Sequence, residues 1–217
     1  MARVEYYVDN DPGQGAGTSM APVNGTYQAQ VEEQIAGTYV IGVRAMDAAG
    51  NWSDVSKDVL SVYDPSGGYV TGHADIAPSA SDVLPLSDRG TKPMTLGFSN
   101  VKYAGTTTAS PSGSVDLSYV VQNNKNEFSL SSTSLSALIV PDAMHATIMG
   151  TADLTVYNGS KTPTVTSNPF RIDMALGNGT VPDHFVVKIY ASGVNIASAT
   201  SLYVIDDDAG LSNVRVK

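Results

Sequence analysis

Residues 43–54 read Val-Arg-Ala-Met-Asp-Ala-Ala-Gly-Asn-Trp-Ser-Asp, and this stretch decides the fold class that we expect for the chain. Its first half alternates small or apolar residues with polar ones, which is the pattern of a half-buried strand. Its second half breaks into Asp47-x-x-Gly50-Asn51, where glycine and asparagine tolerate positive φ and the aspartate can bond the turn backbone. The stretch therefore predicts a strand that ends in a tight corner just before Trp52.

The sequence on both sides of this corner continues in short strands separated by turns. The candidate strands cover residues 4–8, 26–31, 38–46 and 55–62, and a glycine-rich loop covers residues 9–18. In the third strand, the alternation places Tyr39, Ile41, Val43 and Ala45 on one face. Short strands with turns at this spacing predict a small β-sandwich over residues 1–64.

The rest of the chain follows a connector rich in proline and glycine at residues 63–68. Alternating stretches at 94–98, 114–121, 146–156 and 185–190 are longer and rich in serine and threonine. They predict a second, larger module over residues 68–208, either a β-sandwich or a flattened barrel, with residues 209–217 as a tail. We thus expect an all-β fold of two consecutive β-sandwich modules. The longest stretch without strand character is 74–93.

The composition excludes several classes of function. The formal net charge is −9 and no basic stripe is present, so nucleic acid and anionic lipid are disfavoured as partners. The chain has no cysteine, which excludes disulfides, thiolate zinc sites and cysteine nucleophiles. No apolar stretch is long enough to insert into a membrane. Because the chain starts directly in strand-like sequence, we expect it to be a piece of a longer protein.

Two motifs in the first module carry a resemblance to known proteins. The first runs Glu5-Tyr6-Tyr7-Val8-Asp9-x-Asp11-Pro12-Gly13-x-Gly15-x-Gly17, and the second is Val43-Arg44-Ala45-x-Asp47-x-x-Gly50-Asn51-Trp52-Ser53. With them the module resembles the immunoglobulin-like or fibronectin-type repeats of secreted bacterial and archaeal proteins. The resemblance implies an accessory or adhesive module and does not imply an enzyme.

The second module is similar to the β-rich C-terminal module that follows Ig-like arrays in exported prokaryotic proteins. The matching motifs are Gly67-Gly68-Tyr69-Val70-Thr71-Gly72, Leu96-Gly97-Phe98 and Asp183-x-Phe185-x-Val187-x-Ile189. They are spread over most of residues 67–208. Tyr69 stands where that family has tryptophan, and Tyr190-Ala191 replace its acidic turn. This resemblance, too, implies an accessory or adhesive role.

The strongest chemical candidate in the sequence is a metal site. Asp9, Asn10 and Asp11 supply oxygen ligands in the glycine-rich loop, and a sandwich could bring Asp47 to the same end. Calcium takes six to eight such oxygens, and loops at the end of a sandwich can provide them. The open alternative is that these carboxylates bond the backbone amides of their own turns.

Other polar residues give weaker signals. Asp206, Asp207 and Asp208 form an acidic cluster that we interpret as a solvated segment. His73, His145 and His184 lie far apart in sequence, without a partner at ligand or catalytic spacing. No nucleophile elbow and no phosphate-binding glycine loop occur in the sequence. We therefore predict no enzyme.

Carbohydrate binding is another function that the sequence allows, and exposed aromatic rings that stack on sugars would provide it. The candidates for such a platform are Trp52, Tyr6, Tyr7, Tyr69, Tyr103, Tyr157 and Tyr190. Packing of these rings in the core is the competing interpretation.

The sequence as a whole predicts a non-catalytic structural, adhesion or assembly module of a larger prokaryotic cell-surface or secreted protein. Its partners would be neighbouring protein domains and glycans, and its cofactor would be calcium. One alternative is a carbohydrate-binding module of a secreted enzyme. Another is an extracellular filament subunit, in which residues 209–217 pair with a neighbouring chain.

Overall fold

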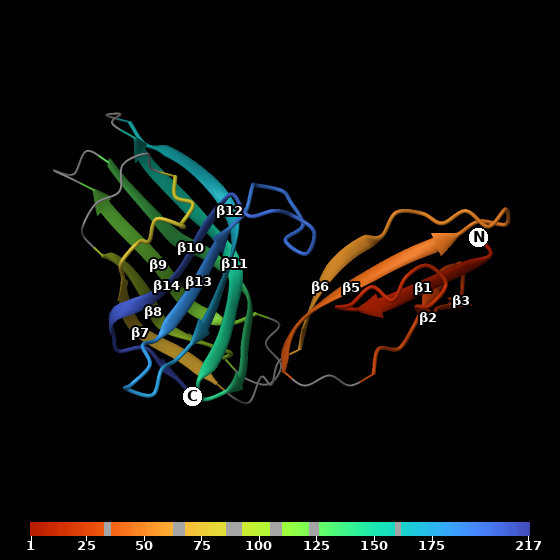
Figure 1. Cartoon of the computed structure of the whole chain (residues 1–217), viewed down its shortest axis with the longest axis horizontal. Helices are drawn as coiled ribbons and strands as arrows, with labels where there is room; N and C mark the ends of the chain where they lie inside the picture. The colour runs from red at the N-terminus through yellow and green to blue at the C-terminus, as the bar shows by residue number, and fades with distance from the viewer. Residues whose placement is uncertain (33–35, 63–67, 86–92, 105–109, 122–125, 159–161) are drawn as a thin grey trace.

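The computed structural model describes residues 1–32, 36–62, 68–85, 93–104, 110–121, 126–158 and 162–217. All regular elements in these ranges are β-strands, so the all-β prediction is confirmed. A closed barrel forms one end of the molecule and a smaller open sheet forms the other, as Figure 1 shows. The connector predicted at residues 63–68 lies almost entirely outside the described residues. No helix that could cross a membrane occurs in the described ranges.

The smaller sheet contains four antiparallel strands in the order β2-β1-β5-β6. Their bounds are Arg3–Val8 for β1, Thr18–Ser19 for β2, Gly37–Met46 for β5 and Ser56–Val62 for β6. A separate hairpin joins β3 (Ala21–Val23) to β4 (Thr26–Gln28). Its two turn residues, Asn24 and Gly25, both have positive φ, as a two-residue hairpin turn requires. Within the described residues, this hairpin is the sole addition to the four-stranded sheet.

The corner after β5 has the structure that its sequence predicts. Gly50 has a φ of 91°, and Met46 and Trp52 form a β-bridge across the corner. The Asp47 carboxylate accepts hydrogen bonds from the backbone N–H groups of Ala49 at 2.8 Å and Asn51 at 2.9 Å. These bonds fix the corner locally.

Strand β1 is buried on both faces, which the sequence analysis did not anticipate. Glu5 and Tyr7 are as inaccessible as Val4 and Tyr6, although the alternation predicts one buried face. The Tyr7 ring covers Gly42, its partner on β5, where an added Cβ would collide with the ring. On β5 the buried residues are Gly42 and Arg44. The face predicted to be apolar, which carries Ile41 and Val43, is only partly buried.

The larger unit is one antiparallel sheet that closes on itself. Eight strands form the barrel and a ninth extends its seam: β7 (Tyr69–Ile76), β8 (Met94–Lys102), β9 (Ser112–Val121), β10 (Asn126–Asp142), β11 (His145–Asn158), β12 (Thr164–Ala175), β13 (His184–Ile189), β14 (Tyr203–Ser212) and β15 (Arg215–Val216). From β7 to β14 each strand pairs with the next, β14 returns to pair with β7, and β15 also pairs with β7. Of the two forms expected for this module, the barrel is therefore the one observed.

The barrel interior holds the main hydrophobic core of the described chain. Alternate residues of the strands point inward, such as Phe170, Ile172 and Met174 on β12. Phe98 and Phe185 stack across the interior, with 6.4 Å between their ring centroids. The closure leaves no open sheet edge along the paired stretches, and this is how a barrel hides its backbone donors and acceptors.

The seam corrects the prediction of a tail at residues 209–217. Ala209 and Ser212 of β14 pair with Ile76 and Ala74, and β15 pairs with the beginning of β7. The Lys217 carbonyl also accepts a hydrogen bond from the Tyr69 N–H at 2.8 Å. The segment belongs to the barrel because β7 needs a partner along its outer edge.

Among the longer strands, β7, β10, β12 and β14 have no counterpart among the strands predicted from the sequence. Strand β10 is 17 residues long, and register shifts interrupt its pairing with β11 at three points. Each shift reverses which face the next residues occupy, so the alternation is broken within the strand. This explains why residues 126–142 do not show a continuous period of two.

The two units contact each other through a small apolar cluster. Ala137, Ile139 and Met149 of the barrel are buried there, and Val59 of β6 packs against them together with Ile196. Ile196 lies in the loop between β13 and β14.

Candidate functional site

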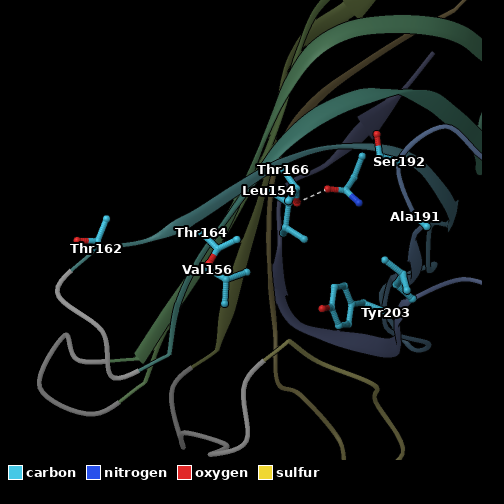
Figure 2. Close-up of a pocket in the computed structure, with 10 residues that line it drawn as sticks. Leu154, Val156, Thr162, Thr164, Thr166, Ala191, Ser192 and Tyr203 are labelled. Atoms are coloured by element: carbon cyan, nitrogen blue, oxygen red, sulfur yellow. Dashed lines mark hydrogen bonds between the residues drawn. The ribbon is translucent and has the colours of Figure 1, made fainter.

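The candidate site is a cleft of about 490 Å³ at one end of the barrel, which we call the mouth cleft. The mouth is the end where β11 finishes and β12 and β14 begin. Figure 2 shows the ten residues that line the cleft: Leu154, Val156, Thr162, Thr164, Thr166, Asn168, Ala191, Ser192, Leu202 and Tyr203. Its volume is in the range typical of small-ligand sites, and barrel mouths are frequent places for them.

The wall formed by β11 and β12 follows from strand register. Thr164 pairs with Val156, and Thr166 pairs with Leu154. Directly paired residues share a face of the sheet, so the two threonines lie on the same face as Leu154, which is buried, and Val156, which is partly buried. The inward face of β12 thus changes from apolar in the barrel centre to hydroxyl-bearing at the mouth.

The floor of the cleft is the side chain of Asn168, which is 3% exposed. Its Nδ2 donates to the Tyr190 carbonyl at 2.7 Å, and its Oδ1 accepts from the Thr166 hydroxyl at 2.6 Å. A buried amide with both ends bonded is held in one orientation. The floor is therefore rigid, and it fixes the start of the loop at residues 190–202.

Across the cleft from Val156 and Thr164 lies Tyr203, the first residue of β14 (Figure 2). The Tyr203 ring packs against the barrel core and is partly exposed. Tyr203 was not among the aromatic candidates of the sequence analysis, because no pattern in the sequence places it at the mouth. Of those candidates, Tyr6, Tyr7, Tyr103 and Tyr190 are buried.

Among the described residues that line the mouth cleft there is no Asp, Glu, Lys, Arg or His. The polar groups of these described residues are hydroxyls and one amide, and the apolar groups are aliphatic side chains and a phenol ring. Hydroxyls both donate and accept hydrogen bonds, so such a lining matches a neutral ligand that itself carries hydroxyls. An ionised ligand would lose its hydration here without gaining an opposite charge from the described lining residues.

Beside Tyr203, a pair of carboxyl groups holds the segment that follows β7. Val83 forms a β-bridge with Val204, and the Asp82 carboxylate accepts from the Asp206 N–H at 3.1 Å. The Asp82 and Asp207 side chains are hydrogen-bonded to each other. Burial and the neighbouring Asp82 together raise the pKa of Asp207 to about 6. Asp207 is thus a half-buried part of the seam, not the solvated acid that the sequence predicts.

The predicted metal ligands do not gather at one point. Asp9 and Asp47 follow opposite ends of the β1–β5 pair, because Val8 is paired with Ile41 and Arg3 with Met46. Six residues of extended strand separate these levels, a distance of about 20 Å. In the described part of the first unit, Asp9 and Asp47 are therefore held about a strand's length apart.

Each predicted ligand with a carboxylate has hydrogen-bond partners of its own. Asp9 accepts from the Val40 N–H at 2.8 Å, and Asp47 accepts from its own turn. Asp11 forms an ion pair with Arg44 at 2.9 Å. Asn10 is exposed in the same loop. Across the described ranges, no three Asp, Glu or His side chains are grouped so that they could hold a metal ion.

The loop at residues 9–17 instead covers a buried ion pair, which the sequence analysis missed. Arg44 Nε donates to Glu5 Oε1 at 2.7 Å, and both side chains are almost wholly buried. Burial alone would raise the pKa of Glu5, but hydrogen bonds from Arg44 and from the Gly15 N–H outweigh it and hold this pKa below its usual value. The Trp52 ring lies 5.6 Å from the Arg44 guanidinium carbon. The glycine-rich loop is thus the cover of a charged core.

The barrel brings two histidines into one row on its outer surface. His145 is paired with Ala175, and Ala175 is paired with His184. The His184 ring lies between two carboxylates, 3.0 Å from Asp206 and 2.9 Å from Asp208. All of these side chains are exposed, so we interpret the row as surface ion pairing.

Comparison of the chain with protein-family models, with curated proteins and with solved structures finds no match. The chemistry of the mouth cleft is therefore inferred from the side chains that line it.

Proposed function

We propose that the chain is a non-catalytic adhesion module of a cell-surface or secreted prokaryotic protein. In this proposal the mouth cleft binds a neutral, hydroxyl-rich ligand, and a carbohydrate chain is the class that fits its chemistry. This proposal combines the adhesive role with the alternative of a carbohydrate-binding module: the chain would adhere by binding a glycan.

The composition of the cleft lining carries the proposal. Thr164, Thr166, Ser192 and Tyr203 offer hydroxyls around a floor whose amide is already bonded, and Leu154 and Val156 offer apolar surface. Sugars present the same combination of hydroxyls and apolar C–H faces, and an aromatic ring such as Tyr203 suits the latter. None of the described lining residues carries a side chain that serves as a general base or acid at neutral pH, apart from the weakly acidic phenol of Tyr203.

The Ig-like or fibronectin-type character of residues 1–64 belongs to this proposal. It is supported by antiparallel strands and by the corner that contains Asp47 and Trp52. An assembly role remains part of the proposal as well. Residues 209–217 are unsuited to donate a strand to a neighbour, because they already pair with β7 in the same chain.

The proposal predicts direct binding of neutral glycans to the full chain. A glycan array identifies a neutral ligand, and calorimetry then measures its affinity for the wild type and for the variant Thr164→Val, whose hydroxyl lines the cleft. This variant removes a hydroxyl in the cleft at nearly constant volume, so we expect the affinity to fall by about threefold to tenfold.

The matched control is Thr155→Val, because Thr155 neighbours Leu154 on β11 but faces the other side of the sheet. We expect wild-type affinity for this control. An array on which the wild type binds no neutral glycan, or binds charged glycans with preference, contradicts the proposed ligand class.

A further inference from the structure

The loop at residues 190–202 contributes to the mouth cleft on one side and to the contact between the two units on the other. Ala191, Ser192 and Leu202, near its two ends, line the cleft. Its middle part carries Asn195 and Ile196, which face the first unit. In Figure 1 the loop is the blue excursion that leaves the barrel on the side of β6.

The middle of the loop is attached to β6 by one hydrogen bond and one apolar contact region. Asn195 Nδ2 donates to the backbone carbonyl of Lys57 at 2.9 Å. Ile196 packs against the same buried cluster as Val59, in which Ile139 of β10 takes part. Asn195 and Ile196 thus attach the loop to the first unit, one by a hydrogen bond and the other by apolar packing.

Asn195 also shapes the loop itself. Its Oδ1 accepts from the Ala197 N–H at 2.8 Å, and its carbonyl accepts from the Ala199 N–H at 3.0 Å. These bonds make a compact turn, so a displacement of Asn195 is transmitted to its neighbours rather than absorbed by a slack chain. At the base, the Leu202 N–H donates to the Ile189 carbonyl at 2.7 Å, and Asn168 holds the Tyr190 carbonyl.

We propose that the first unit braces the loop at residues 190–202 and thereby sets the width of the mouth cleft. The barrel fixes the base of the loop, and β6 fixes its middle. The side of the cleft that carries Ser192 is therefore held both at the base and at the middle of the loop. A cleft whose wall is ordered before the ligand arrives binds the ligand more tightly, because no conformational entropy has to be lost in ordering the wall during binding. Coupling of this kind is reciprocal, so a bound ligand would also strengthen the contact between the units.

The part of this inference that concerns binding rests on the proposed function, but the brace can be tested without a ligand. Hydrogen exchange is measured on the full-length wild type and on Asn195→Ala and Ile196→Ala. We expect amides of residues 191–202 to exchange about threefold to tenfold faster in both variants, as the loss of one hydrogen bond or one small contact allows. Amides of β12 and β13 should keep their wild-type rates.

The matched control for Asn195→Ala is Asn178→Ala. Asn178 also bonds the backbone of its own loop, with its Oδ1 accepting from the Thr180 N–H at 3.1 Å, but that loop lies at the opposite end of the barrel. This control should leave residues 191–202 unchanged. Wild-type exchange of these residues in both Asn195→Ala and Ile196→Ala would overturn the brace.

Binding then separates the two proposals. With a neutral glycan that the wild type binds, we expect Ile196→Ala to lower the affinity, although Ile196 does not line the cleft. Unchanged affinity together with faster loop exchange would overturn the coupling and leave the proposed function intact. Faster loop exchange in a chain that binds no glycan would support the brace and contradict the proposed function.

Discussion

The two units of this chain stabilise their interiors by different means. The barrel encloses inward-pointing Phe, Leu, Ile and Val residues, and phenylalanines such as Phe128, Phe170 and Phe185 are fully inaccessible. The four-stranded sheet of the first unit has few buried apolar side chains, and its least accessible face holds the Glu5–Arg44 pair. The difference shows what closure of a sheet achieves: each inward side chain finds apolar neighbours from the other strands.

An open sheet must find its cover elsewhere. In the first unit a glycine-rich loop folds back over β1, and the Gly15 N–H and the Gly13 carbonyl bond to Glu5 and Arg44. The ion pair therefore ties loop and strands together, while in the barrel most of the core side chains come from the strands themselves. The two units should consequently lose stability under different perturbations.

The largest effect is expected from Glu5→Ala. The substitution leaves the buried Arg44 guanidinium without the partner 2.7 Å away and should destabilise the first unit by about 3–5 kcal/mol. Trp52 lies beside Arg44 and is the single tryptophan, so its fluorescence reports unfolding of this unit. Exchange of barrel amides should stay at wild-type rates.

The matched control is Asp173→Ala on the outer face of the barrel. Asp173 bonds Arg171 at 2.8 Å, but both side chains are about 30% exposed, so its loss should cost about 0–1 kcal/mol. If Glu5→Ala were as mild as this control, or destabilised the barrel equally, the contrast between the units would be wrong.

A second, smaller effect should come from pH, and the two units should respond with opposite sign. Asp207 has a pKa of about 6 in the folded chain, above its ordinary value of 3.8, so its contribution to stability is full below pH 3.8 and is lost as the pH rises through 6. The pKa of Glu5 is lowered in the folded chain, so its contribution to the stability of the first unit depends on pH in the opposite direction. Its contribution is present above pH 4.5 and is lost as the pH falls through the folded value.

The variant Asp207→Asn isolates the barrel part of this response. Asparagine resembles the protonated acid, so at pH 7.5 the variant should be more stable than the wild type by about 1–2 kcal/mol. The difference should vanish at pH 3.5, and exchange of β14 amides across this range measures it. A wild-type seam that strengthens as the pH rises from 4 to 7 would contradict the assignment.

The smallest effect concerns calcium, which the sequence predicts at Asp9, Asn10, Asp11 and Asp47. Because Asp11 is bonded to Arg44 and Asp47 to its own turn, we expect millimolar calcium or its removal by a chelator to change the stability of the first unit by less than about 0.5 kcal/mol. Thermal unfolding followed by Trp52 fluorescence checks this. A clear increase in melting temperature with calcium would contradict this expectation and support the predicted metal site.

Local patterns in the sequence predicted the strands well where the alternation is unbroken. Strands β1, β5, β6, β8, β9, β11 and β13 lie where alternating residues placed them. Strand β10 was missed because its bulges break the alternation, and the mouth cleft was missed because it joins residues 154–168 to residues 191–203. The spacing of residues within one strand does not show which distant segment of the chain that strand will contact.

The sequence by itself determined that this chain is built from β-strands, that a corner follows Met46, and that no thiol chemistry is available to it. The tertiary structure alone decided that the second sheet closes through β14 and β7 and that Glu5 meets Arg44. It also placed hydroxyls from β12 opposite Tyr203. The physical reason is that strand alternation and turn geometry depend on neighbouring residues, whereas closure and burial depend on contacts between residues far apart in the chain.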